Sequence, residues 1–253
     1  MKSYFIPIKK FHDEPYSKII GFPNGTKNQI KKRIIELEKL QVKSISFSGK
    51  TTIGKLSILG KGYVGVVVLA RKDSKKIALK IRRIDSQRKN MKNEELFLKS
   101  VNKINVGPKV FGSSKNFLLM EYIDGIKILD WITQLNGRGS SKKLKIVIKK
   151  ILEDCFALDK MGFDHGELSD ISKHVLIEDN IPYIIDFESG SLKRRTSNVT
   201  SVTQAIFIGS GISKQVQKIY KNPTKNEIIN ALKIYKNCKN RENFEKVLKV
   251  LKL

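Results

Sequence analysis

The sequence predicts an α+β fold, with a small antiparallel sheet in the first half of the chain and mostly helices in the second. Residues 44–81 hold short runs of β-branched and aromatic residues separated by glycine-containing turns, which is typical of strands joined as hairpins. After Asp124-Gly125 the apolar residues recur at helical spacing, above all over residues 141–161. Strands in one part and helices in another favour α+β over an alternating arrangement.

The first 50 residues read as an extension carrying one amphipathic helix. Ile30, Ile34 and Leu37 recur at helical spacing over residues 27–40, so they mark a buried face. The lysines of this helix lie mostly on its other face, so either the helix packs on the next lobe with solvated lysines, or it contacts nucleic acid. We favour packing.

The remaining elements follow in order. In the first half, strands are expected at 44–48, 53–59, 64–70 and 77–81, a helix at 90–102, and strands at 110–111 and 117–122. In the second half, helices are expected at 128–135 and 141–161, a hairpin joins 175–177 to 183–185, and the tail is helical. The inward stripe of the long helix comprises Leu144, Ile148, Ile151, Leu152, Cys155 and Leu158. Thr224 and Glu227 have capping-box spacing at the start of a tail helix.

Composition limits the classes of protein. The chain of 253 residues has 50 Lys and Arg against 24 Asp and Glu, a formal charge of +26. Such a charge attracts polyanions, so RNA or a ribosomal particle is an expected partner; the alternative is that lysine enrichment reflects genome composition or a hot habitat. No long uncharged apolar run or signal-peptide core is present, and the two cysteines lie far apart, so we expect a cytoplasmic protein with reduced thiols and no membrane partner.

The first candidate binding motif has the spacing G-x-G-x-x-G-x-V and consists of Gly60, Gly62, Gly65 and Val67. Glycine lets backbone amides approach phosphate oxygens without a Cβ clash. The same spacing occurs in dinucleotide-binding folds, but there it opens a helix, whereas here a strand follows. The alternative is that these glycines serve only a turn.

A lysine and a glutamate that could form an ion pair follow the glycine motif. Lys80 ends the next strand, where its ammonium could reach phosphates from beneath the glycine loop. Glu94 would pair with Lys80 from the helix at 90–102, with Glu95 as the alternative. For either glutamate the competing interpretation is an ordinary solvated side chain.

Three further motifs follow the glycine loop, Lys80 and Glu94 along the chain: Leu119-Met120-Glu121-Tyr122, His165-Gly-Glu167-Leu168 and Ile185-Asp186-Phe187-Glu188. Together and in this order, these motifs resemble those of the protein kinases. The resemblance implies a two-lobed protein-kinase-like fold, with a small antiparallel-sheet N-lobe and an abbreviated helical C-lobe. It also implies ATP as cofactor with Mg²⁺, or alternatively Mn²⁺. Met120 would be the gatekeeper, Glu121 and Ile123 the adenine-binding hinge, and Asp186 the metal ligand.

The sequence departs from the kinase pattern at three places. Glu167 stands where kinases carry the catalytic aspartate, and its longer side chain shifts the carboxylate. The metal-binding asparagine is expected five positions after Glu167, where Ser172 lies, whereas its place just before the 175–177 strand is taken by His174. Because imidazole is a poor ligand for Mg²⁺, a second metal is absent or Asp170 supplies it. Glu188 replaces a glycine and either stiffens the segment or offers another metal oxygen. His165 is expected to order this loop.

The large lobe is short, which makes the chain similar to the small RIO-type and Bud-type kinases and to archaeal proteins predicted as Ser/Thr kinases. The similarity covers residues 53–192 and divides the chain into an extension (1–50), an N-lobe (51–122) and a C-lobe (123–253). It implies an atypical Ser/Thr protein kinase that phosphorylates a protein or itself, with Glu167 and Lys80 catalytic. The alternatives are a nucleotide-binding pseudokinase, an ATPase switch in RNA or ribosome assembly, and a small-molecule kinase.

Overall fold

A computed structural model describes residues 4–209, 211–221 and 223–253 and confirms the α+β class, with antiparallel sheets and helices. The chain divides into two compact units. The first comprises Met1–Asn102 and Pro108–Tyr122, and the second comprises Lys103–Gly107 and Ile123–Leu253.

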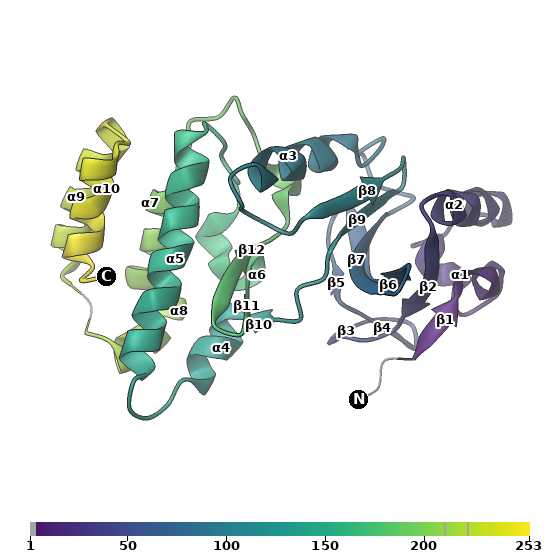
Figure 1. Ribbon diagram of the computed structural model, residues 1–253, viewed down its shortest axis with the longest axis horizontal. Helices are drawn as coiled ribbons and strands as arrows, with labels where there is room; N and C mark the ends of the chain where they lie inside the picture. Colours follow the sequence, from purple (N-terminus) through teal and green to yellow (C-terminus); the bar gives the residue numbers. More distant parts are fainter. Residues whose placement is uncertain (1–3, 210, 222) are drawn as a thin grey trace. The chain divides into compact units, whose positions relative to one another are not determined.

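The first unit is built on a seven-stranded antiparallel sheet (Figure 1). The strand order is β1 (Phe5–Pro7), β2 (Val42–Ser46), β6 (Gly65–Lys72), β7 (Lys75–Arg82), β9 (Phe117–Glu121) and β8 (Val110–Ser113), with β5 (Gly60–Lys61) paired to β6. Strands β6 and β7 form the predicted hairpin, and Asp73 in their turn has φ of 52°. A short aspartate side chain tolerates this left-handed backbone better than most residues do.

Residues 4–50 belong to the same unit as the sheet. Besides β1 and β2 they form η1 (Ile8–His12), α1 (Ser17–Ile20) and α2 (Lys27–Lys39), and Figure 1 shows α2 close to β2. Ile30, Ile34 and Leu37 of α2 lie in one apolar core with residues of β6, β7 and β9. The lysines of α2 are exposed. This arrangement is the packing alternative favoured above.

One expected strand is wrong. Residues 53–59 form parts of two strands, β3 (Thr51–Ile53) and β4 (Leu56–Ile58), which pair as a separate hairpin. The chain reverses at Gly54, whose φ of 57° suits glycine. Strand β1 also lacked any prediction, because three residues at a sheet edge carry too little periodicity.

Helix α3 (Lys92–Asn102) completes the first unit. Asn90 Oδ1 accepts a hydrogen bond from the Lys92 backbone N–H at 3.0 Å, which satisfies one donor at the helix start. The helix buries Leu98 and Val101 together with one charged residue, Glu94.

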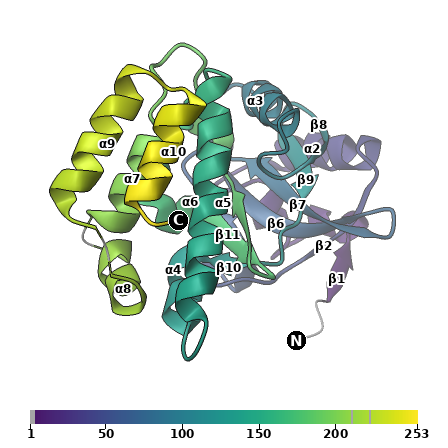
Figure 2. The same cartoon turned by 60° about the vertical axis from the view of Figure 1, so that its left-hand side comes forward.

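The second unit is mainly helical. Helix α5 (Ser140–Lys160) buries the whole predicted apolar stripe and packs along α7 (Asn198–Phe207), while α9 (Lys225–Asn237) and α10 (Arg241–Val250) form a pair, seen in Figure 2. The other elements are β10 (Ile126–Lys127), α4 (Ile128–Gln134), η2 (Leu168–Asp170), α6 (Ile171–His174), β11 (Val175–Glu178), β12 (Ile181–Ile184), η3 (Phe187–Ser189) and α8 (Ile212–Ile219). Strands β10, β11 and β12 form a second antiparallel sheet. The predicted Thr224–Glu227 capping box is present at the start of α9.

A buried polar network joins three helices of this unit. Asp159 of α5 accepts hydrogen bonds from the Asn198 side chain at 2.8 Å and from the Tyr235 hydroxyl at 2.9 Å. Burial raises the pKa of Asp159, although these donors oppose the shift. The network therefore fixes how α5, α7 and α9 pack.

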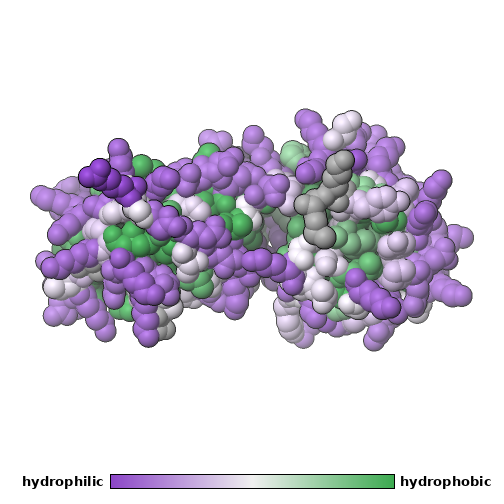
Figure 3. All heavy atoms as spheres, turned by 90° about the horizontal axis from the view of Figure 1, so that it is seen from below, coloured by the Kyte–Doolittle hydropathy of each residue, from purple (hydrophilic) through white to green (hydrophobic). Residues whose placement is uncertain are grey.

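Most side chains on the face in Figure 3 are hydrophilic, with smaller hydrophobic groups between them. Among the helices of the described residues, none is both long enough and apolar enough to span a bilayer.

Candidate functional site

The glycine hairpin of the first unit needs glycine for two different reasons. At Gly65 a Cβ would lie 2.7 Å from the Ile81 carbonyl oxygen and 3.3 Å from Cγ of Lys80, so the neighbouring strand excludes a side chain. At Gly60 a Cβ would meet nothing within 4 Å, and at Gly62 only a carbonyl at 3.6 Å. None of the three has a positive φ. Among the residues that the structure describes, neither a close contact nor a positive φ requires glycine at 60 and 62.

Lys80 of β7 forms a buried ion pair with Glu94 of α3. The Lys80 Nζ to Glu94 Oε1 distance is 2.7 Å, and each side chain is 5% exposed. The alternative partner, Glu95, pairs instead with Lys99 at 2.8 Å on the surface of α3. Lys80 lies opposite Val67 in the β6–β7 register, so the structure brings Gly65, Val67, Lys80 and Glu94 together.

The expected hinge residues lie at the end of β9. Met120 pairs with Ala78 of β7, and the Glu121 backbone N–H donates to the Lys109 carbonyl at 2.8 Å. The Glu121 side chain accepts from the Lys109 N–H at 3.1 Å. Ile123 is buried and belongs to the second unit.

Asp186 of the second unit follows β12 in an unusual backbone conformation, with φ of 67° and ψ of 70°. Non-glycine residues rarely adopt positive φ, and such strained residues cluster at functional sites. The preceding residue is held by His165, whose Nε2 contacts the Ile185 carbonyl at 3.1 Å.

His165 is fully buried, and its ring packs edge-on against Phe187 at 5.0 Å between centroids. Burial lowers the pKa of His165 to about 4, so the imidazole is neutral at pH 7 and donates from one nitrogen only. This arrangement matches the loop-ordering role expected from the sequence.

Glu167 precedes η2, and both of its carboxylate oxygens are engaged. Oε1 accepts a hydrogen bond from Ser189 Oγ at 2.7 Å, and Oε2 lies 3.2 Å from His174 Nε2. One ligand atom each from Glu167, His174 and Asp186 lie within 4.8 Å of one another. The sequence analysis did not predict the contact of Glu167 with Ser189, which lies 22 residues further along the chain, or its contact with His174.

The other acidic residues near this group differ in their surroundings. Asp170 pairs with Lys173 at 2.7 Å and accepts a hydrogen bond from Ser172, so its carboxylate is engaged elsewhere. These contacts lower the pKa of Asp170. Glu188, in η3, is 8% exposed. The carboxylates of Asp186 and Glu167 suit a hard divalent cation, which prefers oxygen ligands.

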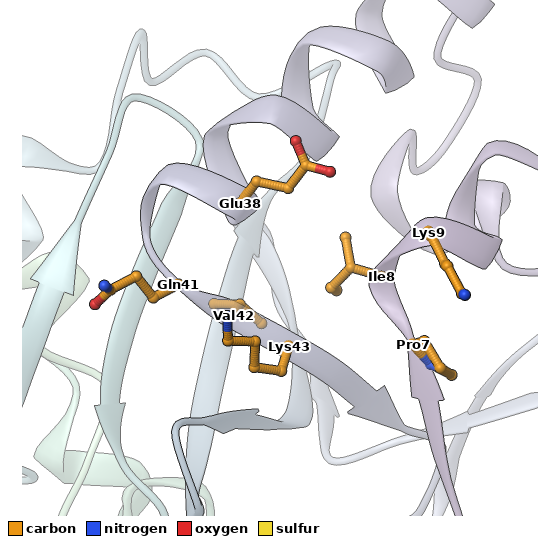
Figure 4. Close-up of a pocket in the computed structure, with 7 residues that line it drawn as sticks. All are labelled: Pro7, Ile8, Lys9, Glu38, Gln41, Val42 and Lys43. Carbon is orange, nitrogen blue, oxygen red and sulfur yellow. The ribbon is translucent and has the colours of Figure 1, made fainter.

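A hollow of about 260 Å³ lies elsewhere in the first unit, between the start of η1 and the segment joining α2 to β2 (Figure 4). Its lining includes Lys9, Glu38 and Lys43, and it includes none of the site residues expected from the sequence.

No model of a known protein family matches the chain. Over 99 residues, 39% of the chain, the sequence is 30% identical to the uncharacterized protein MJ1211 of Methanocaldococcus jannaschii. The match covers 81% of that protein.

Proposed function

We propose that this chain, which belongs to the same family as the uncharacterized protein MJ1211, is an ATP-dependent phosphotransferase with a two-lobed, protein-kinase-like fold. Within that class it would be an atypical, RIO-like Ser/Thr protein kinase that phosphorylates a protein or itself. The observation that carries the proposal is the buried pair of Lys80 and Glu94.

Stability alone does not explain this pair. Removing two charges from water costs several kcal/mol for each ion, and well-packed apolar residues at such places often stabilise a protein as much or more. Glu94 instead holds the Lys80 ammonium beside the glycine hairpin, where Gly65 lies against the lysine stem. An ammonium held in this way suits the phosphates of a nucleotide.

The open backbone at Gly60 and Gly62 supports the same ligand. Backbone N–H groups without a neighbouring Cβ can approach phosphate oxygens closely. A Cβ would meet no atom within 4 Å at Gly60 and only the Gly65 carbonyl at 3.6 Å at Gly62, which leaves room for a phosphate chain. Met120 and Glu121 at the end of β9 would then contact the adenine.

In the second unit, Asp186 would hold the metal ion that accompanies ATP. A bound divalent cation neutralises negative charge on the phosphoryl group during transfer. Glu167, at the place of the kinase aspartate, would orient the acceptor hydroxyl. Variants in each unit test these roles separately.

The test is transfer of the γ-phosphate from labelled ATP to protein, with Mg²⁺ or Mn²⁺, for the full chain and for the variants Lys80→Ala and Asp186→Asn. Asparagine tolerates the left-handed backbone at position 186, so this variant removes charge with little strain. Lys76→Ala and Asp179→Asn are matched controls, because each removes an exposed charge from the same β-hairpin region as its counterpart.

We expect label on protein that is lost in Lys80→Ala and Asp186→Asn and retained in both controls. Release of free phosphate without labelled protein would favour the ATPase switch. A chain that neither binds ATP nor transfers phosphate would overturn the proposal.

One observation favours a second candidate, a nucleotide-binding pseudokinase. Ser189 and His174 engage both oxygens of Glu167, so its carboxylate is less available to an acceptor hydroxyl. ATP that raises the melting temperature without any turnover would support this alternative.

A further inference from the structure

Two of the departures from the kinase pattern contact each other. Glu167 and His174 replace an aspartate and an asparagine, and the structure places Oε2 of one 3.2 Å from Nε2 of the other. Asp186 lies in the same group, with its ligand atom within 4.8 Å of theirs. The two replacements therefore change one local arrangement together.

The backbone fixes where these side chains lie. The His174 carbonyl accepts a hydrogen bond from the Ile185 N–H at 2.9 Å, which ties the end of α6 to the residue before Asp186. Ser189 holds the other oxygen of Glu167. Metal ligands are commonly oriented by such outer hydrogen bonds. These two hydrogen bonds therefore hold His174, Glu167 and the residue before Asp186 in place.

A buried imidazole at position 174 lowers the stability of the fold. His174 is 7% exposed, and within the described residues its Nδ1 has no hydrogen-bond partner. Burying a polar atom without a partner destabilises a protein. Nδ1 keeps no partner whether Nε2 contacts Glu167 or a metal ion, so the evidence for ligation is the position of the imidazole beside two carboxylates.

The spacing suits direct ligation. With metal–ligand bonds of about 2.1 Å, adjacent ligand atoms lie about 3.0–3.4 Å apart in octahedral and tetrahedral sites. The separation of 3.2 Å between Glu167 and His174 falls within this range, and the Asp186 oxygen lies within 4.8 Å of both ligand atoms.

We propose that Glu167, His174 and Asp186 form one divalent-metal site whose imidazole selects first-row transition metals over Mg²⁺. Imidazole is a poor ligand for Mg²⁺, whereas affinity for sites with nitrogen ligands rises from Mn²⁺ to Co²⁺. The use of this ion in phosphoryl transfer rests on the proposed function, but the binding of the ion does not. Glu167 then ligates the metal through Oε2, the oxygen nearest to His174.

The test is calorimetric titration of the full, metal-stripped chain with Co²⁺, Mn²⁺ and Mg²⁺, without nucleotide. We expect the wild type to bind Co²⁺ and Mn²⁺ at least about 10-fold more tightly than Mg²⁺, and His174→Asn to lose at least about 10-fold in Co²⁺ affinity. Pulsed electron paramagnetic resonance of bound Mn²⁺ should show nitrogen modulation from an imidazole, and His174→Asn should abolish it.

Two variants serve as controls. His12→Asn removes an exposed imidazole of the first unit, and Asp170→Asn removes a nearby carboxylate that the site excludes. Both should keep the wild-type affinities and the nitrogen signal. The double variant Glu167→Asp/His174→Asn, which restores the kinase residue types, should shift the preference toward Mg²⁺.

The fluorescence of Trp131, the single tryptophan of the chain, reports whether each variant folds, and His174→Gln is a second variant if His174→Asn does not. Bound Mn²⁺ without nitrogen modulation, or equal Co²⁺ affinity in wild type and a folded His174 variant, would overturn the site. ATP binding in the presence of EDTA is measured in parallel, so loss of the proposed function and loss of the metal site are separate results.

Discussion

The two units differ in how closely their residues follow the kinase pattern. In the first unit, Gly65, Lys80 and Glu94 keep the residue types of the pattern, and the structure brings them together in a buried cluster. In the second unit, Glu167 and His174 depart from the pattern and contact each other beside Asp186.

The comparison indicates that residue changes are easier to accommodate around Glu167 than at the Lys80–Glu94 pair. Lys80 and Glu94 are buried, so altering one removes the ion pair that offsets the buried charge of the other. The Glu167 side chain is 39% exposed and contacts His174. A change from aspartate to glutamate at position 167 could therefore be accommodated by a change at one neighbouring residue. The predictions below test this difference, starting with the largest expected effect.

Breaking the buried pair should destabilise the first unit strongly. Lys80→Met leaves the Glu94 charge buried, and removing one partner of such a pair typically costs about 3–5 kcal/mol. Hydrogen exchange of the β6 and β7 amides measures this loss. Lys80→Met/Glu94→Leu should recover most of the stability, and Lys76→Met, on the exposed part of β7, should change it little. A Lys80→Met variant as stable as wild type would mean that loss of the ion pair leaves no costly buried charge on Glu94.

The second unit should lose stability in mild acid through His165. The folded pKa of about 4 lies below the ordinary value of 6.5, so the contribution is complete above pH 6.5 and is lost as pH falls toward 4. A shift of this size corresponds to about 3 kcal/mol. Denaturant unfolding of the metal-free chain in EDTA, followed by Trp131 fluorescence, measures the effect.

The matched variant is His165→Gln, whose amide can still donate to the Ile185 carbonyl. It should be less stable at pH 7 but should lose less stability between pH 6.5 and 4, because the titrating group is gone. Equal acid sensitivity in the two proteins would show that His165 is not neutral in the folded state.

Alanine variants of the hairpin glycines should show which glycine is required for folding and which for ATP binding. Gly65→Ala places a Cβ against the Ile81 carbonyl and should cost about 1–3 kcal/mol of stability. Gly60→Ala and Gly62→Ala should change stability by less than about 0.5 kcal/mol, yet weaken ATP binding. Thermal unfolding with and without ATP distinguishes these effects. Unchanged ATP affinity in both Gly60→Ala and Gly62→Ala would remove the phosphate role of this loop.

Smaller losses of stability than that of Gly65→Ala are expected from two capping boxes, one in each unit. Thr26 caps α2 with Gln29, and Thr224 caps α9 with Glu227. Replacing either threonine by alanine should cost about 1 kcal/mol, whereas serine should keep most of the stability. Hydrogen exchange of the two helices shows whether each change affects its own unit only. Loss of protection in both units from one variant would mean that they unfold together.

Periodicity and local signals were enough to predict most elements. The apolar stripe of α5, the β6–β7 hairpin and the Thr224 capping box depend on neighbours in sequence, and all three are present. The hairpin at Gly54 and the strand β1 were missed, because short segments carry little periodic information.

The sequence by itself determined the α+β class and which residues are candidates for phosphate and metal binding, because spacing and residue type are local properties. Only the tertiary structure decided that Glu94 and not Glu95 pairs with Lys80, that a side chain would fit at Gly60 but not at Gly65, and that Glu167 contacts His174. Each of these depends on which atoms meet after the chain has folded. Residue spacing along the chain does not specify such contacts.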